Sequence, residues 1–195
     1  VRFKADETPT TTEYNYGLSN PQGIAWTTTR GGGADGALVI ADTDNHRVLI
    51  LPLDGSPSTS VGTGARGSSD ATPTFNFPYG VAVDGAGVIY VADNQNNSIR
   101  RIAADNTVTT FATGFNRPAA IAFGNGRLYV ADTLNNAVVV MDLAGARLQT
   151  LSVPSNPRGL LWLGGNTGLL VSEPSTFLIR QVLGSTSRVF MGVSG

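Results

Sequence analysis

The sequence repeats itself about every 40 residues, and this repeat constrains the fold more than any other feature. One repeated segment is an apolar run that ends in an acidic residue and is followed by turn residues, as in VADNQNNSIRRI from Val91. Its copies begin at Ile40, Val130 and Val171. A second segment lies upstream of each copy and has the forms NPQGIAW, FPYGVAVD, RPAAIAF and NPRGLLW. Two matched segments in every period identify four copies of one structural unit.

Each unit contains four short runs of strand-forming residues separated by turn residues. In the second unit the runs are GVAV, VIYVAD, SIRRI and VTTFAT, which predict strands over 80–83, 88–93, 98–102 and 108–113. Short turns between them predict a four-stranded antiparallel meander. Apolar character falls from the first run to the last, which is typical of a wedge that is buried at its inner edge and wetted at its outer edge. The sequence therefore predicts an all-β fold, a propeller of four-stranded antiparallel blades.

Residues 75–102, FNFPYGVAVDGAGVIYVADNQNNSIRRI, closely resemble the NHL repeat, whereas the Gly-His and Trp-Asp marks of WD40 repeats are missing. The resemblance covers about four repeats and is weakest in the fourth, where Glu173, Pro174 and Thr176 depart from the pattern. It implies a β-propeller, and NHL propellers are usually closed rings of about six blades. Three alternatives follow: a fragment of a larger propeller, which we favour, a small closed ring, or an open array completed by another copy.

We expect one NHL-repeat domain over residues 1–195. In an open array each terminal blade keeps an uncovered apolar flank, which predicts self-association. The expected units are a partial blade over 1–19 and repeats over 20–74, 75–114, 115–153 and 154–195.

Composition narrows the possible partners and compartments. Thirteen basic and fourteen acidic residues leave a net charge of −1, so no basic field attracts nucleic acid and none is expected as a partner. The absence of cysteine excludes disulfides and thiolate zinc sites. No apolar run approaches the 18 or so residues of a membrane span, and the N-terminus has no signal pattern. We expect a soluble chain or a soluble piece of a larger protein, in a compartment that the sequence leaves open.

The acidic residue that ends each second strand is predicted to be structural. We expect its carboxylate to accept hydrogen bonds from turn N–H groups, and the Asn three positions later to adopt the left-handed conformation. A catalytic residue is needed once, whereas every blade needs its turn. The predicted structural turn residues are Asp42, Asn45, Asp93, Asn96, Asp132, Asn135 and Glu173.

Metal and catalytic motifs are weak. His46 is the only histidine, and in a turn we expect it to be a surface polar residue. A single histidine cannot supply the several zinc ligands of the peptide-amidating lyases, which resemble NHL propellers. Asp42 and Asp44 form half of a calcium pattern, but the glycine and glutamate of an EF-hand loop are missing, and no Gly-x-Ser-x-Gly motif is present. We expect no cofactor, no metal and no catalytic residue.

The resemblance favours a non-catalytic module that binds a protein, peptide or glycan. The turns between second and third strands share a face with the connections into each first strand, and this face is the expected binding surface. The alternative is a metal-dependent propeller enzyme, lactonase- or lyase-like, whose site is incomplete in this chain. The candidate binding residues are Asp44, His46, Arg47, Asn97, Asn136 and Phe177 from the turns and Gln22, Tyr79, Arg117 and Arg158 from the connections.

Overall fold

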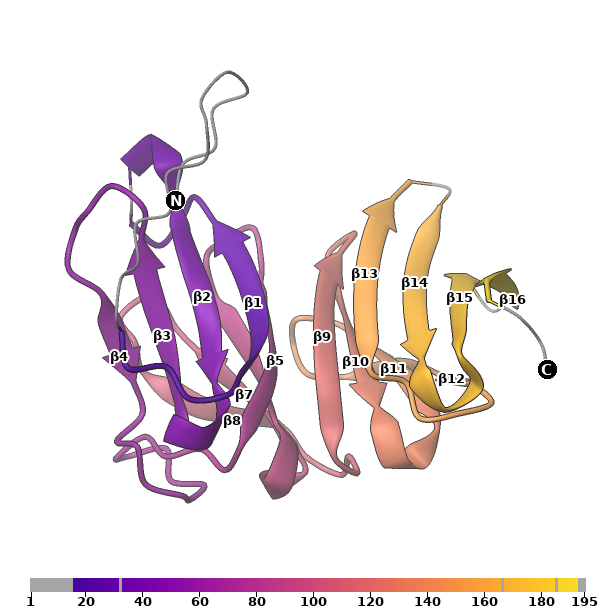
Figure 1. The fold of residues 1–195 in the computed structure, drawn as a ribbon, viewed down its shortest axis with the longest axis horizontal. Coiled ribbons are helices and arrows are strands. Elements are labelled where there is room, and N and C mark those ends of the chain that lie inside the picture. The colour runs from indigo at the N-terminus through magenta and orange to yellow at the C-terminus, as the bar shows by residue number, and fades with distance from the viewer. Residues whose placement is uncertain (1–15, 32, 166, 185, 193–195) are drawn as a thin grey trace.

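The computed structural model describes residues 16–192 except 32, 166 and 185 (Figure 1). Its strands form four antiparallel sheets of four strands each, paired in chain order. Blade 1 contains β1 (Pro21–Thr27), β2 (Ala37–Asp42), β3 (Arg47–Pro52) and β4 (Thr59–Val61). Blade 2 contains β5 (Pro78–Val83), β6 (Ile89–Asp93), β7 (Ser98–Ile102) and β8 (Val108–Ala112). Blade 3 contains β9 (Pro118–Gly124), β10 (Arg127–Asp132), β11 (Ala137–Met141) and β12 (Arg147–Ser152). Blade 4 contains β13 (Gly159–Gly164), β14 (Gly168–Glu173), β15 (Leu178–Leu183) and β16 (Thr186–Met191).

The predicted all-β propeller architecture and the four strands of blade 2 are confirmed. Most of the predicted partial blade over 1–19 lies outside the described residues, and 16–19 contain no strand. The helices of the described residues are single 3-10 turns, and none is long and apolar enough to cross a membrane.

The core lies between the blades. Along β5, Val81 is buried against blade 1, whereas the neighbouring Ala82 is buried against blade 3, because successive side chains of a strand point to opposite faces. The first strands β1, β5, β9 and β13 lie side by side in Figure 1. A Cβ atom added to Gly80 would lie 2.7 Å from the carbonyl oxygen of Ala119, so the innermost strands approach backbone to backbone. Small residues in the first strands therefore allow the blades to converge.

The outer flanks of blades 1 and 4 expose the positions that are buried between blades elsewhere. Ile24 of blade 1 is 65% exposed, whereas Val81, at the same position of blade 2, is buried. Leu161 of blade 4 is 57% exposed, whereas its counterparts Ala82 and Ala122 are buried. Each flank thus presents a surface of inter-blade type that no described residue covers.

Candidate functional site: the turn face

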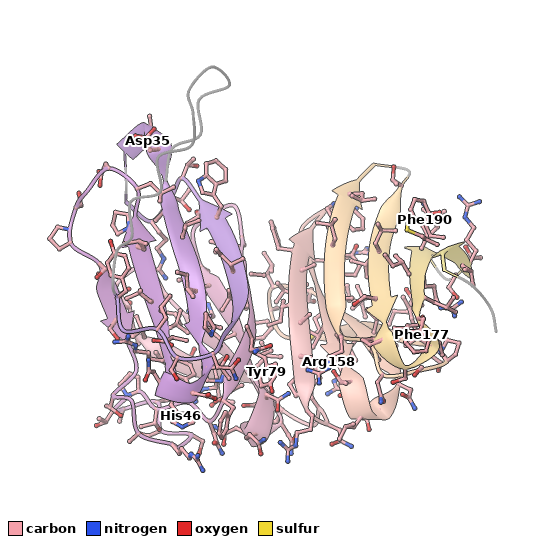
Figure 2. All side chains as sticks on the ribbon, in the orientation of Figure 1. Asp35, His46, Tyr79, Arg158, Phe177 and Phe190 are labelled. Atoms are coloured by element: carbon pink, nitrogen blue, oxygen red, sulfur yellow. The ribbon has the colours of Figure 1, made fainter. Side chains whose placement is uncertain are left out.

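The turns between second and third strands gather at one end of the blades, which we call the turn face. Figure 2 places His46, Tyr79, Arg158 and Phe177 at this end and Asp35 at the opposite end. Each turn is a single 3-10 turn that ends in a left-handed residue, one position later than the predicted Asn45, Asn96 and Asn135. That expectation was wrong because a 3-10 turn has helical dihedrals at its three residues and reverses only at the next one. The left-handed residues are His46 (φ 51°), Asn97 (53°), Asn136 (51°) and Phe177 (58°).

Asp93 is fully buried and joins its turn to the start of its own blade. Its Oδ1 accepts a 2.7 Å hydrogen bond from the Asn76 N–H, and its Oδ2 accepts one of 2.8 Å from the Asn96 side chain and one of 3.1 Å from Arg100. Burial raises the pKa of Asp93 although these three donors lower it. The turn therefore donates to Asp93 through the Asn96 side chain, as expected, whereas the backbone N–H donor lies before the first strand and was not expected.

The same arrangement recurs in blades 1 and 3. Oδ1 of Asp42 accepts a 2.7 Å hydrogen bond from the Ser19 backbone N–H, and Oδ1 of Asp132 accepts a 2.7 Å hydrogen bond from the Asn116 backbone N–H. The side chains of Asn45 and Asn135 donate to the second carboxylate oxygens at 2.9 Å each. In blade 4 the buried Glu173 instead forms an ion pair with Arg180. These carboxylates face the blade interior and are closed to a ligand.

The residue after each aspartate ties its blade to the next one, a role that the sequence reasoning missed. The Thr43 hydroxyl donates to the Pro78 carbonyl at 2.7 Å. The Asn94 amide donates to Pro118 at 3.0 Å, and the Thr133 hydroxyl donates to Pro157 at 2.8 Å. The available signal was a hydroxyl or amide in three turns matched with a proline at the start of each next blade. Blade 4 has Pro174 at this position, whose side chain has no donor.

His46 is not the surface residue expected from a lone turn histidine, since it is 6% exposed. Its Nδ1 lies 3.2 Å from the Phe77 backbone nitrogen, and its Nε2 lies 3.1 Å from Nε of Arg66. Both neighbours are donors, so at most one contact is a hydrogen bond at a time, because neutral imidazole has one acceptor nitrogen. Burial lowers the pKa of His46, and the charge of Arg66 lowers it further. His46 therefore lies between blades 1 and 2, where burial and two facing N–H donors oppose protonation of the imidazole.

A pocket of about 290 Å³ opens on the turn face across blades 2, 3 and 4. We call it the inter-blade pocket. Tyr79, Ala119 and Arg158 occupy the same position in three successive first-strand segments, and the turns of blades 2 and 3 complete the lining. Tyr79, Arg117 and Arg158 were predicted candidates, whereas Asn94, Gln95, Thr133 and Leu134 were not. The lining residues are Tyr79, Asn94, Gln95, Arg117, Ala119, Thr133, Leu134 and Arg158.

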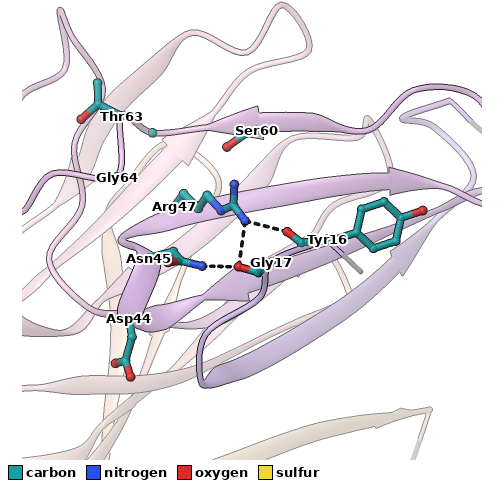
Figure 3. Close-up of a pocket in the computed structure, with 9 residues that line it drawn as sticks. Tyr16, Gly17, Asp44, Asn45, Arg47, Ser60, Thr63 and Gly64 are labelled. Carbon is teal, nitrogen blue, oxygen red and sulfur yellow. Dashed lines mark hydrogen bonds between the residues drawn. The ribbon is translucent and has the colours of Figure 1, made fainter. Parts of the chain in front are cut away.

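A second hollow, of about 450 Å³, lies beside the blade 1 turn (Figure 3). Arg47 pairs with Asp42 at 2.6 Å and donates to the carbonyls of Tyr16 and Gly17 at 3.0 and 3.4 Å. Asn45 donates to Gly17 at 2.7 Å. The candidate Asp44 lines this hollow and is exposed, but Arg47 is committed to the fold.

The remaining candidates line neither of these two pockets. Gln22 is exposed and donates to the Asn20 side chain at 2.6 Å. Asn97 is exposed, and its Oδ1 accepts a 2.9 Å hydrogen bond from the backbone N–H of Arg117 in the next blade. Asn136 is exposed, and Phe177 is 85% exposed at the edge of blade 4. Within residues 16–192, the three gaps aside, no group of three or more His, Asp or Glu side chains could hold a metal ion.

Comparison with known proteins supports the repeat assignment. Residues 75–102 match the NHL repeat family. A segment of 68 residues, 33% of the chain, is 44% identical to NHL repeat-containing protein 2 of Homo sapiens. A segment of 80 residues, 40% of the chain, is 39% identical to the Gallus gallus protein of that name. The matched segments cover only 9% and 11% of these relatives.

Solved propellers share the fold at low sequence identity. A catalytically inactive virginiamycin B lyase from Staphylococcus aureus with quinupristin superposes with a TM-score of 0.73 at 18% identity, over 95% of this chain and 60% of the lyase chain. A chain from a nidogen/laminin complex superposes with a TM-score of 0.57 at 20% identity, over 72% of this chain and 50% of that chain. The match over residues 75–102 confirms the predicted NHL repeat, and the blade topology confirms the predicted β-propeller.

Proposed function

We propose that this chain is a non-catalytic NHL-type propeller module that binds a protein, peptide or glycan through its turn face. The observation that carries the proposal is the inter-blade pocket, which side chains from three blades line together. A site built at the junction of rigid sheets is held in place by the packing of the blades. Binding sites in repeat folds commonly lie on such a surface.

Different residues of each turn hold the blade together and line the pocket, which supports the turn face as the binding surface. Residues that recur in several blades, such as Asp93 and Asn96, form hydrogen bonds with other residues of this chain. Residues that differ between copies, such as Gln95 and Leu134, point out of the turns and line the pocket. A face whose frame is constant and whose outward side chains vary is suited to recognising one specific partner.

Propellers of similar fold are known with ligands. One similar structure is that of a nidogen/laminin complex, and another is that of a lyase with quinupristin. Both likenesses are below 25% identity and concern the fold alone. They support binding by a propeller without identifying the partner of this chain.

The test compares two exposed leucines at opposite ends of blade 3. Leu134 lines the pocket and is 52% exposed, whereas Leu143 lies in the turn between β11 and β12 and is 40% exposed. The 195-residue chain is screened against a random peptide library displayed on phage and against a glycan array. Binding of the selected ligands should weaken about tenfold in Leu134→Ser, the effect of losing one buried apolar anchor, and should persist in Leu143→Ser.

Failure to select any ligand, or equal loss in both leucine variants, would count against the turn face as a binding surface. Metal analysis of the purified protein addresses the enzymatic alternative. Stoichiometric zinc, magnesium or calcium would favour the metal-dependent enzyme.

A further inference from the structure

We infer that the inter-blade pocket binds a carboxylate side chain of an acidic peptide segment, with an apolar residue beside it. This inference rests on the proposed function, since it names the ligand chemistry of the same site.

Arg117 and Arg158 supply unopposed positive charge. Both line the pocket, and no acidic residue among those that the structure describes lines it with them. Their guanidinium groups form no ion pair or hydrogen bond to any residue within the described part of the chain. By contrast, Arg100 and Arg180 are paired with buried carboxylates. Each guanidinium group carries a fork of N–H donors, which matches the two oxygens of a carboxylate.

Two backbone carbonyl groups accept hydrogen bonds from side chains that line the pocket. The Asn94 side-chain amide donates a hydrogen bond to the Pro118 carbonyl, and the Thr133 hydroxyl donates one to the Pro157 carbonyl. Free carbonyls would repel an anion and attract a cation. Since these two already accept hydrogen bonds, they attract a cation less strongly, and the two arginines are the only charged residues of the described chain in the lining.

The rest of the lining selects an apolar neighbour for that anion. The Tyr79 ring lies 5.9 Å from the guanidinium carbon of Arg158, close to the limit of about 6 Å for a cation–π contact. Tyr79, Ala119 and Leu134 contribute the apolar surface. A volume of about 290 Å³ lies just below the range of pockets that enclose whole small ligands, which is about 300–1,000 Å³. The pocket therefore suits one or two side chains of a peptide.

The experiment uses a phage-displayed library of random peptides and three forms of the chain. These are the wild type, the double variant Arg117→Gln with Arg158→Gln, and the control Arg127→Gln. Arg127 is exposed at the opposite end of blade 3, and its guanidinium is likewise unpaired within the described residues. Peptides selected by the wild type should be enriched in Asp or Glu beside an apolar residue. Their affinity should fall at least about tenfold in the double variant and when their acid is replaced by its amide, and should change little in the control.

Three outcomes would overturn the inference. Neutral peptides that lose binding in Leu134→Ser would sustain the proposed function and overturn the acidic ligand. If acidic peptides bind the double variant and the wild type with equal affinity, their carboxylate binds outside the inter-blade pocket. Binding to uronic or sulfated glycans alone, lost in the double variant, would overturn the peptide as the partner. A double variant whose melting temperature falls below that of the control is replaced by the single variant Arg158→Gln, which changes the more exposed arginine.

Discussion

Arg100 and Asp93 form an ion pair in which both side chains are fully buried, with Nη1 of Arg100 3.1 Å from Oδ2 of Asp93. Arg100 also binds Asp70 and the carbonyls of Ser69 and Thr74, so it fastens the long connection before blade 2 to the blade. Its Nε has no hydrogen-bond partner among the residues that the structure describes. The buried cation therefore depends on the few acceptors that it has.

Asp93→Ala should destabilise the chain strongly. Loss of the carboxylate leaves Arg100 buried with less compensation, which costs about 3 kcal/mol or more. Asp132→Ala is the matched control, because Asp132 holds the same backbone and asparagine contacts but pairs with no arginine within the described residues. We expect a smaller loss there, about 1–3 kcal/mol. Urea denaturation followed by circular dichroism measures both, and equal losses would contradict the role of the ion pair.

The inter-blade hydrogen bond of Thr43 makes a second stability prediction. Thr43→Val keeps the side-chain shape but leaves the buried Pro78 carbonyl without its 2.7 Å donor. The free energy of unfolding should fall by about 1–3 kcal/mol. Thr43→Ser retains the hydroxyl and should recover most of that loss. A serine variant as unstable as the valine variant would show that the methyl group, rather than the hydrogen bond, matters.

The fold was predictable because its signal is periodic, whereas the turn details depend on contacts between distant segments. Repeated apolar runs were enough to place β5 to β8. The burial of His46 was not predictable, because Arg66, which covers it, comes from the connection to blade 2. The error over the left-handed residue had a local cause. An Asn suits a left-handed turn wherever it stands, and DNQNN offers several of them.

The candidate site was predictable only in part for a similar reason. Tyr79, Arg117 and Arg158 were found because they stand in the connections that a propeller brings to one face. Asn94 and Thr133 were missed because their neighbour is the next blade, and the contact appears only when the blades are packed. Comparing the repeats therefore identifies which residues lie on the turn face, whereas their contacts with the next blade become known only from the packing of the blades.

Phe177→Asn should stabilise the chain. Phe177 has φ 58°, a conformation that is strained for a bulky residue, and its ring is 85% exposed, so little burial is lost. Asparagine occupies the same turn position at Asn97 and Asn136 and tolerates it better. We expect a gain of about 1 kcal/mol in the free energy of unfolding, measured by urea denaturation.

Phe77 provides the contrast, since it also has a positive φ, of 51°. Its ring packs edge-on against the His46 ring, with 4.6 Å between the ring centroids. The guanidinium carbon of Arg66 lies 4.7 Å from the centroid of the Phe77 ring. Phe77→Asn should therefore lower stability, because lost packing exceeds relieved strain. Stabilisation by both substitutions would mean that the packing of Phe77 contributes little.

The exposed flanks predict self-association. Ile24 and Leu161 occupy positions that are buried between internal blades, so blade 4 of one copy should pack on blade 1 of another. Sedimentation velocity should show mass above that of a monomer, increasing with concentration. Leu161→Lys should shift the protein toward monomer, whereas Leu148→Lys, on the outermost strand of blade 3, should not. A wild-type protein that stays monomeric at all concentrations would contradict the prediction.

His46 predicts a loss of stability in mild acid. Burial lowers its pKa and the charge of Arg66 adds to this, whereas in the unfolded chain the imidazole titrates near pH 6.5. Between the two pKa values the unfolded state binds more protons, so stability is complete above about pH 6.5 and falls as the pH decreases below it. Between pH 6.5 and pH 5 this loss cannot exceed about 2 kcal/mol, because each unit of pH contributes at most about 1.4 kcal/mol.

His46→Asn isolates this contribution, because asparagine stands at the same turn position at Asn97 and Asn136 and does not titrate. Urea midpoints at pH 5.0, 6.0 and 7.5 should change less with pH in this variant than in the wild type. The remaining slope of the variant belongs to carboxylates such as Asp93, whose raised pKa is common to both proteins and cancels in the comparison. Equal slopes would mean that the imidazole accepts a proton as easily in the folded chain as in the unfolded one, and that the two donors facing it do not hold it neutral.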